Sequence, residues 1–199
     1  MQVIKIYPHG FGCNSYIVTA DGKSAVIVDC AEESVYDECV KRGLAPAAVL
    51  LTHGHFDHVG GCGIFYAKGV PVYCGEKEAE YIFSAENKGI FGGVYIPDFK
   101  IYKTLSDGEC IEVAGINFKV IHTPGHTAGG VCYLAGDCLF TGDTLFCGSV
   151  GRCDLPTGSA AQLTKSVKKL LALAGNLNLY CGHGEDTTSA YEKRYNPYA

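Results

Sequence analysis

The chain has 199 residues, of which 47% are hydrophobic and 19% charged, a balance that fits one globular domain over residues 1–199 and excludes a disordered or fibrous protein. Its formal net charge of −5 disfavours a nucleic-acid partner, because binding to phosphates requires clustered Lys and Arg. No apolar run approaches the roughly 20 residues of a membrane span, so we expect no membrane partner.

The first residues and the cysteines indicate where the protein works. Met1–Gly10 lacks the apolar stretch of a secretory signal. The eleven cysteines are an odd number and form no C-x-x-C pair, which disfavours both a disulfide framework and a zinc ribbon. We therefore expect a cytoplasmic protein in which most cysteines are reduced and buried as small hydrophobic side chains.

The first part of the chain alternates between strand-like and helix-like segments. Short apolar runs separated by turns predict strands at Val3–Tyr7, Tyr16–Thr19, Ala25–Asp29 and Ala48–Thr52. Helical spacing and a following glycine predict helices at Glu32–Arg42 and Gly61–Lys68.

The segment Ile82–Leu105 follows neither pattern. It combines three glycines and a proline with five aromatic residues: Phe83, Phe91, Tyr95, Phe99 and Tyr102. Long irregular connections often carry function, so two interpretations are open, a lid over a pocket or a packed excursion.

The second half of the chain returns to regular elements. Strands are predicted at Cys110–Val113, Ile116–Thr123, Val131–Leu134, Cys138–Thr141 and Leu177–Cys181. Ser159–Leu173 is the clearest helix, because its apolar residues recur on one face, and Thr188–Tyr195 is a closing helical turn. Strands alternating with helices indicate an α/β sandwich.

A His-rich turn follows the predicted strand Ala48–Thr52. The residues T-H-G-H-F-D-H place His53 and His55 two positions apart and Asp57 beside His58. Imidazole and carboxylate groups are the ligands expected for Zn, Fe or Mn. An irregular turn could point both pairs at neighbouring positions, so we interpret this stretch as a metal-binding loop rather than an exposed polar loop.

Three later residues repeat this arrangement at the ends of other predicted strands. His126, Asp143 and His183 each come shortly after a strand, beside glycines that permit close approach of the backbone. Each is a weak signal alone. Because ligands in α/β folds gather at the carboxyl ends of strands, the four clusters together predict one metal site.

The spacing of these residues resembles that of the metallo-β-lactamase fold superfamily, whose pattern is H-x-H-x-D-H followed by H, D and H. The stretch H-T-P-G-H-T, His122–Thr127, is most similar to the glyoxalase II (hydroxyacylglutathione hydrolase) branch. The resemblance covers nearly the whole chain and implies an αβ/βα four-layer sandwich of two mixed β-sheets flanked by helices. Glyoxalase II also has a C-terminal helical domain, whereas this chain ends sixteen residues after His183, so it resembles the stand-alone members.

The resemblance also implies the ligand set of a dinuclear site. It assigns three histidines to one metal: His53, His55 and His126. It assigns a mixed set to the second metal: Asp57, His58 and His183, with Asp143 bridging both. We expect two divalent ions, Zn first and Fe or Mn as alternatives, with open positions for water.

The implied activity is that of a metallohydrolase. A metal-bound hydroxide attacks the carbonyl of a thioester or ester, as in glyoxalase II-like hydrolysis of S-lactoylglutathione. Asp57 is expected to orient this nucleophile as well as to ligate, which makes it the candidate catalytic residue. His122 is expected to be structural or to support a ligand residue, and Asp29 is either a group that holds a ligand histidine or a plain turn carboxylate.

The substrate contacts depart from those of glyoxalase II. A basic residue is kept at Arg152, but Cys153–Asp154 stands where an aromatic side chain would help to bind glutathione. Arg152 either binds a substrate carboxylate or forms a structural ion pair. The expected partner is a small-molecule thioester or ester, acted on by a monomer or a small homo-oligomer.

Other members of the superfamily share the motif. Persulfide dioxygenases, which use a single iron, also have a segment like Gly151–Asp154, and lactonases share the ligand pattern, so both stay open as alternatives. Three classes are disfavoured. Flavodiiron domains need Glu at the position of His55, nucleic-acid-processing branches have basic surfaces, and a non-catalytic binding module would have lost ligands.

Overall fold

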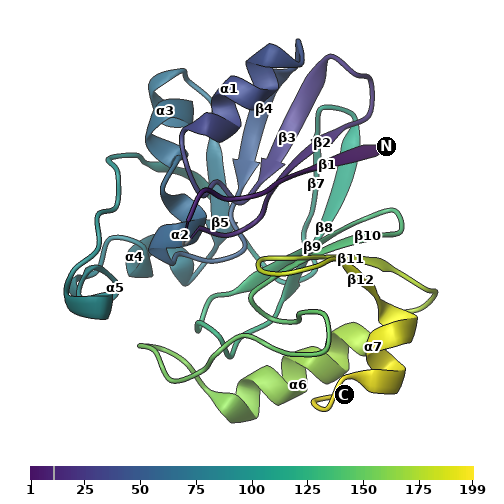
Figure 1. The fold of residues 1–199 in the computed structure, drawn as a ribbon. Coiled ribbons are helices and arrows are strands. Elements are labelled where there is room, and N and C mark those ends of the chain that lie inside the picture. Colours follow the sequence, from purple (N-terminus) through teal and green to yellow (C-terminus); the bar gives the residue numbers. More distant parts are fainter. Residues whose placement is uncertain (11) are drawn as a thin grey trace.

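Two β-sheets packed face to face form the centre of the protein, and helices cover their outer faces (Figure 1). The computed structural model describes residues 1–10 and 12–199. The fold is therefore the four-layer sandwich of two mixed sheets that the sequence predicts, with three apolar cores between the layers.

The first sheet follows the chain in order, and its first half is antiparallel while its second half is parallel. Its strands are β1 (Gln2–Ile6), β2 (Ser15–Thr19), β3 (Ser24–Val28), β4 (Ala45–Leu50), β5 (Val72–Gly75) and β6 (Ile101–Leu105). The connections between its parallel strands contain α1 (Ser34–Lys41), α2 (Phe56–Val59), α3 (Cys62–Ala67), α4 (Glu78–Tyr81), α5 (Ala85–Lys88) and the 3-10 turn η1 (Ile90–Gly92).

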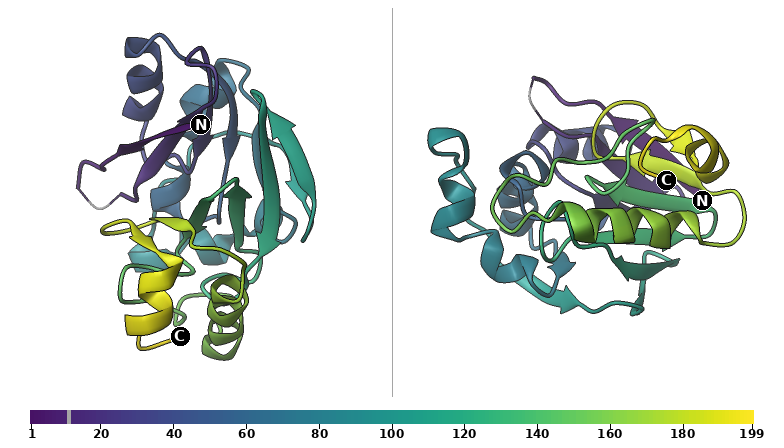
Figure 2. Two further views of the ribbon diagram at one scale, coloured as in Figure 1. Left: turned by 90° about the vertical axis from the view of Figure 1, so that its right-hand side faces the viewer. Right: turned by 90° about the horizontal axis from the view of Figure 1, so that it is seen from below.

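The second sheet is antiparallel except for one parallel pair, β10 with β11. Its spatial order is β12 (Thr187–Thr188), β11 (Asn178–Cys181), β10 (Cys138–Gly142), β9 (Val131–Ala135), β8 (Ile116–His122) and β7 (Cys110–Val113). The helices α6 (Ala160–Leu171) and α7 (Ser189–Tyr195) lie side by side on its outer side (Figure 2).

The apolar patterns of the elements explain how the layers pack. Along β3 the side chains alternate, so that Val26 and Val28 pack between the two sheets while Ala25 and Ile27 pack toward α1 and α3. The helix α6 begins at the N-cap Ser159, which accepts a hydrogen bond from the Gln162 N–H, and it buries its apolar face on the second sheet.

Two strands of the first sheet, β5 and β6, are not among the predicted strands. The edge strand β6 exposes Tyr102, Lys103 and Thr104, so it lacks the alternation of a half-buried strand. The segment Ile82–Leu105 is not one irregular connection, because it contains α5, η1 and β6. The final segment begins with the short strand β12 before the predicted helical turn.

The carboxyl ends of five strands meet at one edge of the sandwich. β3 and β4 of the first sheet run parallel, as do β10 and β11 of the second, and β8 points the same way as β10. The predicted convergence of the clusters that follow these strands is confirmed.

No helix in the described part of the chain is long and apolar enough to cross a membrane.

The cysteines lie where the sequence places them. All eleven are free, and eight of them are buried in the described structure. They pack within the apolar cores, with members such as Cys39, Cys62 and Cys132 fully covered. The prediction that most cysteines act as small buried hydrophobic side chains is confirmed.

Candidate metal centre

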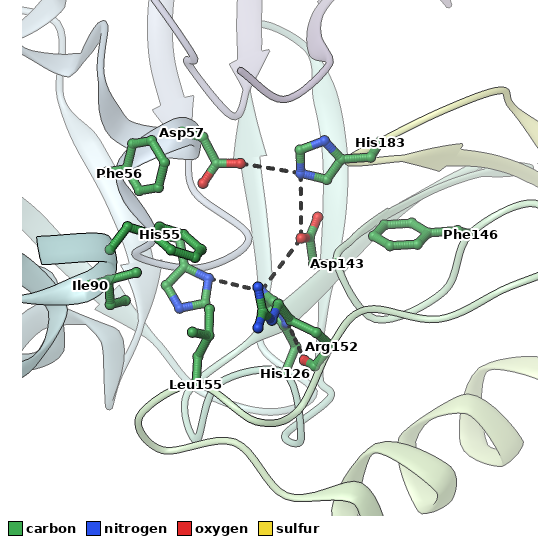
Figure 3. Close-up of a pocket in the computed structure, with 11 residues that line it drawn as sticks. His55, Phe56, Asp57, Ile90, His126, Asp143, Phe146, Arg152, Leu155 and His183 are labelled. Carbon is green, nitrogen blue, oxygen red and sulfur yellow. Dashed lines mark hydrogen bonds and ion pairs between the residues drawn. The ribbon is translucent and has the colours of Figure 1, made fainter. Parts of the chain in front are cut away.

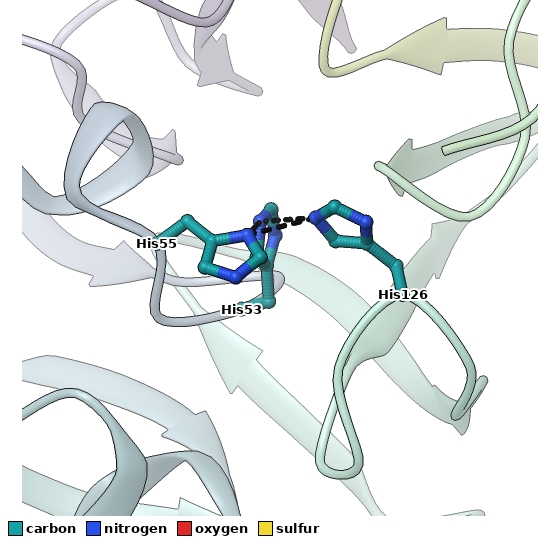
Figure 4. Close-up of side chains that lie close together, drawn as sticks. All are labelled: His53, His55 and His126. Atoms are coloured by element: carbon teal, nitrogen blue, oxygen red, sulfur yellow. Dashed lines mark hydrogen bonds between the residues drawn. The ribbon is translucent and has the colours of Figure 1, made fainter. Parts of the chain in front are cut away.

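Three histidine rings from two loops converge on one point (Figure 4). His53 and His55 follow β4, and His126 lies in the turn after β8. His55 Nδ1 lies 3.1 Å from His53 Nε2 and 2.8 Å from His126 Nε2, and the two Nε2 atoms are 3.2 Å apart. Bonds of about 2.0–2.1 Å to a tetrahedral ion would hold such nitrogens about 3.3 Å apart, so the spacing fits one metal ion.

A second group, Asp57, His58 and His183, lies beside the first. Figure 3 shows Asp57 and His183 of this group facing Asp143. Asp57 Oδ2 is 3.2 Å from His183 Nε2 and 3.8 Å from His58 Nε2. Asp143 stands between the groups, because its Oδ1 is 3.3 Å from His58 Nε2 and its Oδ2 is 3.4 Å from His126 Nε2 and 3.5 Å from His183 Nε2. One carboxylate therefore faces both groups.

Asp29 holds two of these histidines, one directly and one through Thr52. His58 Nδ1 donates to Asp29 Oδ2 at 2.9 Å. The Thr52 N–H and hydroxyl donate to the same carboxylate at 2.7 Å each, and the hydroxyl oxygen accepts from His53 Nδ1 at 3.1 Å. Both rings therefore present Nε2 to the centre. Asp29 is therefore hydrogen-bonded to a candidate ligand histidine and is not a plain turn carboxylate.

Two further contacts orient the other rings of the first group. His126 Nδ1 donates to the main-chain carbonyl of Arg152 at 2.6 Å, which leaves Nε2 facing the centre. His55 Nε2 lies 3.3 Å from the hydroxyl oxygen of Tyr81, whose proton is donated to the Pro156 carbonyl. His55 therefore turns Nδ1 inward, unlike its neighbours.

The protonation states suit metal binding. Burial and the neighbouring imidazoles lower the pKa of His53, and they lower that of His55 to about 3, so both rings are neutral, as ligation requires. Burial alone would raise the pKa of Asp143, but the charges of His58 and His126 hold it well below its usual range. Asp143 is therefore a carboxylate.

Two buried atoms at the centre, His58 Nε2 and Asp143 Oδ1, have no hydrogen-bond partner within the described residues. A buried ring nitrogen and a buried carboxylate oxygen that lack hydrogen-bond partners are costly unless a cation binds them. These two atoms and the neutral rings of His53 and His55 show that the cluster is suitable for a dinuclear metal site.

A buried thiol adjoins the second group but is not suited to ligation. Cys13, Asp29 and His58 lie within metal-binding distance of one another. Burial raises the pKa of the Cys13 thiol to about 12, although the charge of His58 acts in the opposite sense. Because the thiolate is the form that binds metals, Cys13 belongs to the packing behind His58.

Two buried residues that no sequence pattern singles out, Glu78 of α4 and Asn87 of α5, hold the two ligand loops. Glu78 Oε2 accepts from the Gly54 N–H at 2.7 Å, and Oε1 accepts from Thr127 Oγ1 at 2.6 Å and the Gly129 N–H at 3.0 Å. Asn87 Nδ2 donates to the Gly54 carbonyl at 2.7 Å. The peptide between His53 and His55 is thus fixed at both its N–H and its C=O.

The centre opens into a cavity of about 700 Å³ (Figure 3). Five of its eleven lining residues belong to the candidate ligands: His55, Asp57, His126, Asp143 and His183. The others are apolar apart from one arginine: Phe56, Ile90, Phe91, Phe146, Leu155 and Arg152. The turn η1, which carries Phe91 in a left-handed conformation with φ of 54°, forms part of the wall.

Arg152 and His122 both lie near the centre but outside the candidate ligand groups. Arg152 lines the cavity, and its side chain forms a two-bond ion pair with Asp154, at 2.7 Å from Nε and 2.8 Å from Nη2. His122 is not among the clustered side chains, and its Nε2 lies 3.1 Å from the Ala128 carbonyl, across the turn that carries His126.

Comparison with known proteins shows the family. The model of the metallo-beta-lactamase superfamily matches residues 9–183. The chain belongs to this superfamily. It is 38% identical to a protein of unassigned function from Aquifex aeolicus, with 100% of this chain and 97% of that protein covered. It is 33% identical to hydroxyacylglutathione hydrolase GloC of Haemophilus influenzae, with 98% and 97% covered.

Solved structures of this superfamily share the whole fold. BLEG-1, described as a B3 metallo-beta-lactamase, superposes with a TM-score of 0.92 at 32% identity, with 99% of both chains covered. TTHA1623 in a di-iron-bound form has a TM-score of 0.85 at 33% identity, with 99% of this chain and 100% of that chain covered. ETHE1 from Myxococcus xanthus has a TM-score of 0.78 at 27% identity, with 99% and 84% covered.

Proposed function

We propose that this metallo-beta-lactamase superfamily hydrolase is a glyoxalase II-like thioesterase that acts on small-molecule thioesters in the cytoplasm. The observation that carries the proposal is the position of Asp143 between two ligand groups at the floor of an open cavity. The likeness to hydroxyacylglutathione hydrolase GloC over nearly the full length of both chains supports the thioester as the substrate class.

The proposed ligands divide as the two side-chain groups do. One ion would be held by His53, His55 and His126, and the other by Asp57, His58 and His183, with Asp143 shared between them. Zn is the first candidate, and Fe or Mn the alternatives, since TTHA1623 is described with two irons. When bound, such ions lower the pKa of a coordinated water and polarise a substrate carbonyl.

The side chains around the cavity favour a thiolate leaving group. Among the described lining residues outside the ligand set, Arg152 is the one ionisable group, and a guanidinium stays protonated. The cavity therefore offers no general acid beyond the ligands. A thiol of pKa about 8.5 leaves as the thiolate without protonation, whereas an amine needs an acid.

Asp57 is proposed to orient the attacking water. Burial raises its pKa, but the charges of His58 and His183 lower it below the usual value, so the side chain is a carboxylate. Its Oδ2 is 3.2 Å from His183 Nε2, and the carboxylate lines the cavity. A carboxylate oxygen at this wall can accept a hydrogen bond from a water that approaches a bound carbonyl.

The test is hydrolysis of two thioesters, S-lactoylglutathione and S-hexanoyl-N-acetylcysteamine, by protein purified without oxygen, with metals counted in the same sample. We expect loss of the absorbance of at least one thioester with about two metal ions per chain. Two metals without loss of either thioester would refute the thioesterase, and lactones and a β-lactam, the latter chosen because BLEG-1 is described as a metallo-beta-lactamase, would then be assayed.

A second candidate is a mononuclear iron persulfide dioxygenase. It is favoured by the segment Gly151–Asp154 and by a group of two histidines and one carboxylate, His53, His58 and Asp143, which is the ligand type of non-haem iron oxygenases. The structural likeness to ETHE1 is consistent with it. One iron per chain with oxygen uptake on glutathione persulfide, and no thioester loss, would establish this alternative.

A further inference from the structure

The cavity beside the metal centre has a floor and sides of different chemical character. Its floor consists of candidate ligands, and its sides consist of apolar side chains from four separate segments: Phe56, Ile90, Phe91, Phe146 and Leu155. A substrate whose carbonyl lies over Asp143 would place the rest of its acyl or thiol part against these sides. The apolar character of these sides therefore determines which acyl or thiol groups a substrate can carry.

The single arginine on these walls is already paired. Arg152 donates from Nε to Asp154 Oδ1 at 2.7 Å and from Nη2 to Oδ2 at 2.8 Å, which is the bidentate geometry of a strong guanidinium–carboxylate pair. Its guanidinium carbon also lies 5.7 Å from the centre of the Phe91 ring, so the cation faces an aromatic surface on its other side. A substrate carboxylate at the remaining guanidinium N–H groups would lie beside the Asp154 carboxylate and be repelled by it.

Glutathione fits these walls poorly. It carries two carboxylates and one ammonium group, whereas none of the described lining residues outside the ligand set offers a free cation or an anion. Moving such charges against phenylalanine and leucine side chains without partners is unfavourable.

We propose that, in the thioester hydrolysis inferred above, the part of the substrate that extends from the scissile carbonyl to the sides of the cavity is uncharged and apolar, such as an alkyl or aryl group. Phe91, Phe146 and Leu155 then determine specificity by burying this group. Arg152 shapes the wall together with Asp154 and does not bind a substrate carboxylate. The inference deepens the proposed function and rests on it for the thioester itself.

Binding of thioethers tests the walls without any reaction. We would titrate zinc-loaded protein in a calorimeter with S-methyl-N-acetylcysteamine, S-hexyl-N-acetylcysteamine and S-hexylglutathione. Each buried methylene strengthens binding about threefold to fourfold, so the hexyl compound should bind at least tenfold more tightly than the methyl compound. Replacing N-acetylcysteamine by glutathione should bring no gain.

Two matched variants test which residue contacts the hexyl group. Phe91 and Tyr95 are exposed aromatic residues of the same segment, at 68% and 82%, but only Phe91 lines the cavity. Phe91→Ser should weaken binding of the hexyl compound about fivefold or more, whereas Tyr95→Ser should leave it unchanged. Equal losses in both variants would contradict the assignment of Phe91.

Two results would overturn the inference. Equal affinity for the methyl and hexyl compounds would mean that the walls do not contact the ligand. Tenfold tighter binding of S-hexylglutathione, lost in Arg152→Met, would mean that a substrate carboxylate binds Arg152. Because thioethers are not hydrolysed, these results are independent of the thioester assay, whose failure counts against the proposed function alone.

Discussion

Single hydrogen bonds decide which atom each histidine presents to the metal centre. Asp29, Thr52 and the Arg152 carbonyl each occupy one ring nitrogen of a histidine and leave the other free. Groups that orient ligands in this way commonly change metal affinity 10–100-fold when they are removed. The metal affinity of the centre therefore depends also on groups that do not themselves bind the metal.

The shared position of Asp143 predicts how two substitutions differ. Asp143→Asn removes the charge that faces both groups, so we expect both metal sites to lose occupancy together. His183→Ala removes a ligand of one group only and should lower the content toward one ion per chain. Metal counting after dialysis against a weak chelator measures both, and equal retention in the two variants would refute the bridging role.

Burial of Glu78 predicts a pH-dependent contribution to stability. Burial raises the pKa of this carboxyl from 4.5 to about 7, so its protonated form is favoured in the folded protein. The stabilisation is fully present below pH 4.5 and is lost as the pH rises through 7. Relative to Glu78→Gln, the wild type should lose up to about 3 kcal/mol of unfolding free energy between pH 4.5 and pH 8.

Urea unfolding of both forms, each freed of metal, measures this difference at successive pH values. The ligand histidines and carboxylates titrate equally in the two proteins, so their contribution cancels. A stability difference that does not change across this range would show that Glu78 stays ionised at neutral pH.

At the scale of elements, the segment from α4 to β6 contains a structural part and a part that lines the cavity. The helices α4 and α5 carry Glu78 and Asn87, which hold the Gly54 peptide, while η1 carries Phe91 at the cavity wall. β6 completes the first sheet. Only the part around η1 is therefore placed to act on substrate.

Substitutions in the two parts should have different effects on stability, metal content and KM. Asn87→Ala removes hydrogen bonds to the Gly54 and Ile82 carbonyls in a buried position and should cost about 1–3 kcal/mol of stability together with some metal retention. Phe91→Ser should raise KM and leave the metal content unchanged. Thermal unfolding, metal counting and steady-state kinetics on both variants test this, and metal loss in Phe91→Ser would place η1 in the structural part.

At the scale of the whole molecule, the centre joins the two sheets. Asp57 and His58 follow a strand of the first sheet, whereas Asp143 and His183 follow strands of the second. A Cβ at residue 182 would clash with Asp143 Oδ1, so a glycine is required where β11 leads into the site. Metal binding should therefore stabilise both halves of the sandwich together.

Removal of metal tests this coupling. A ligand present at 1,000 times its Kd adds about 4 kcal/mol to the unfolding free energy, so chelation should lower the Tm of one common transition. His9→Ala is the matched control, because this histidine is exposed and lies outside the centre. Two separate transitions, of which chelation moves only one, would show that the halves unfold independently.

Much of the fold and all seven candidate ligands could be predicted from local pattern. Alternation of apolar residues identifies strands such as β3, helical spacing identifies α6, and the ligands follow strand ends in short motifs. β6 could not be predicted, because an edge strand with exposed side chains lacks that alternation. The predictable strands, helices and ligand motifs each extend over only a few residues, which is the range of a local pattern.

The sequence by itself therefore determined most elements, the family resemblance and the candidate ligands, because each of these rests on short motifs of neighbouring residues. Only the tertiary structure decided which groups hold the ligands and what lines the cavity. Glu78 meets Gly54 and Gly129 across 24 and 51 residues, and the Arg152 carbonyl meets His126 across 26. Such hydrogen bonds depend on how distant segments pack, and spacing along the chain carries no record of that.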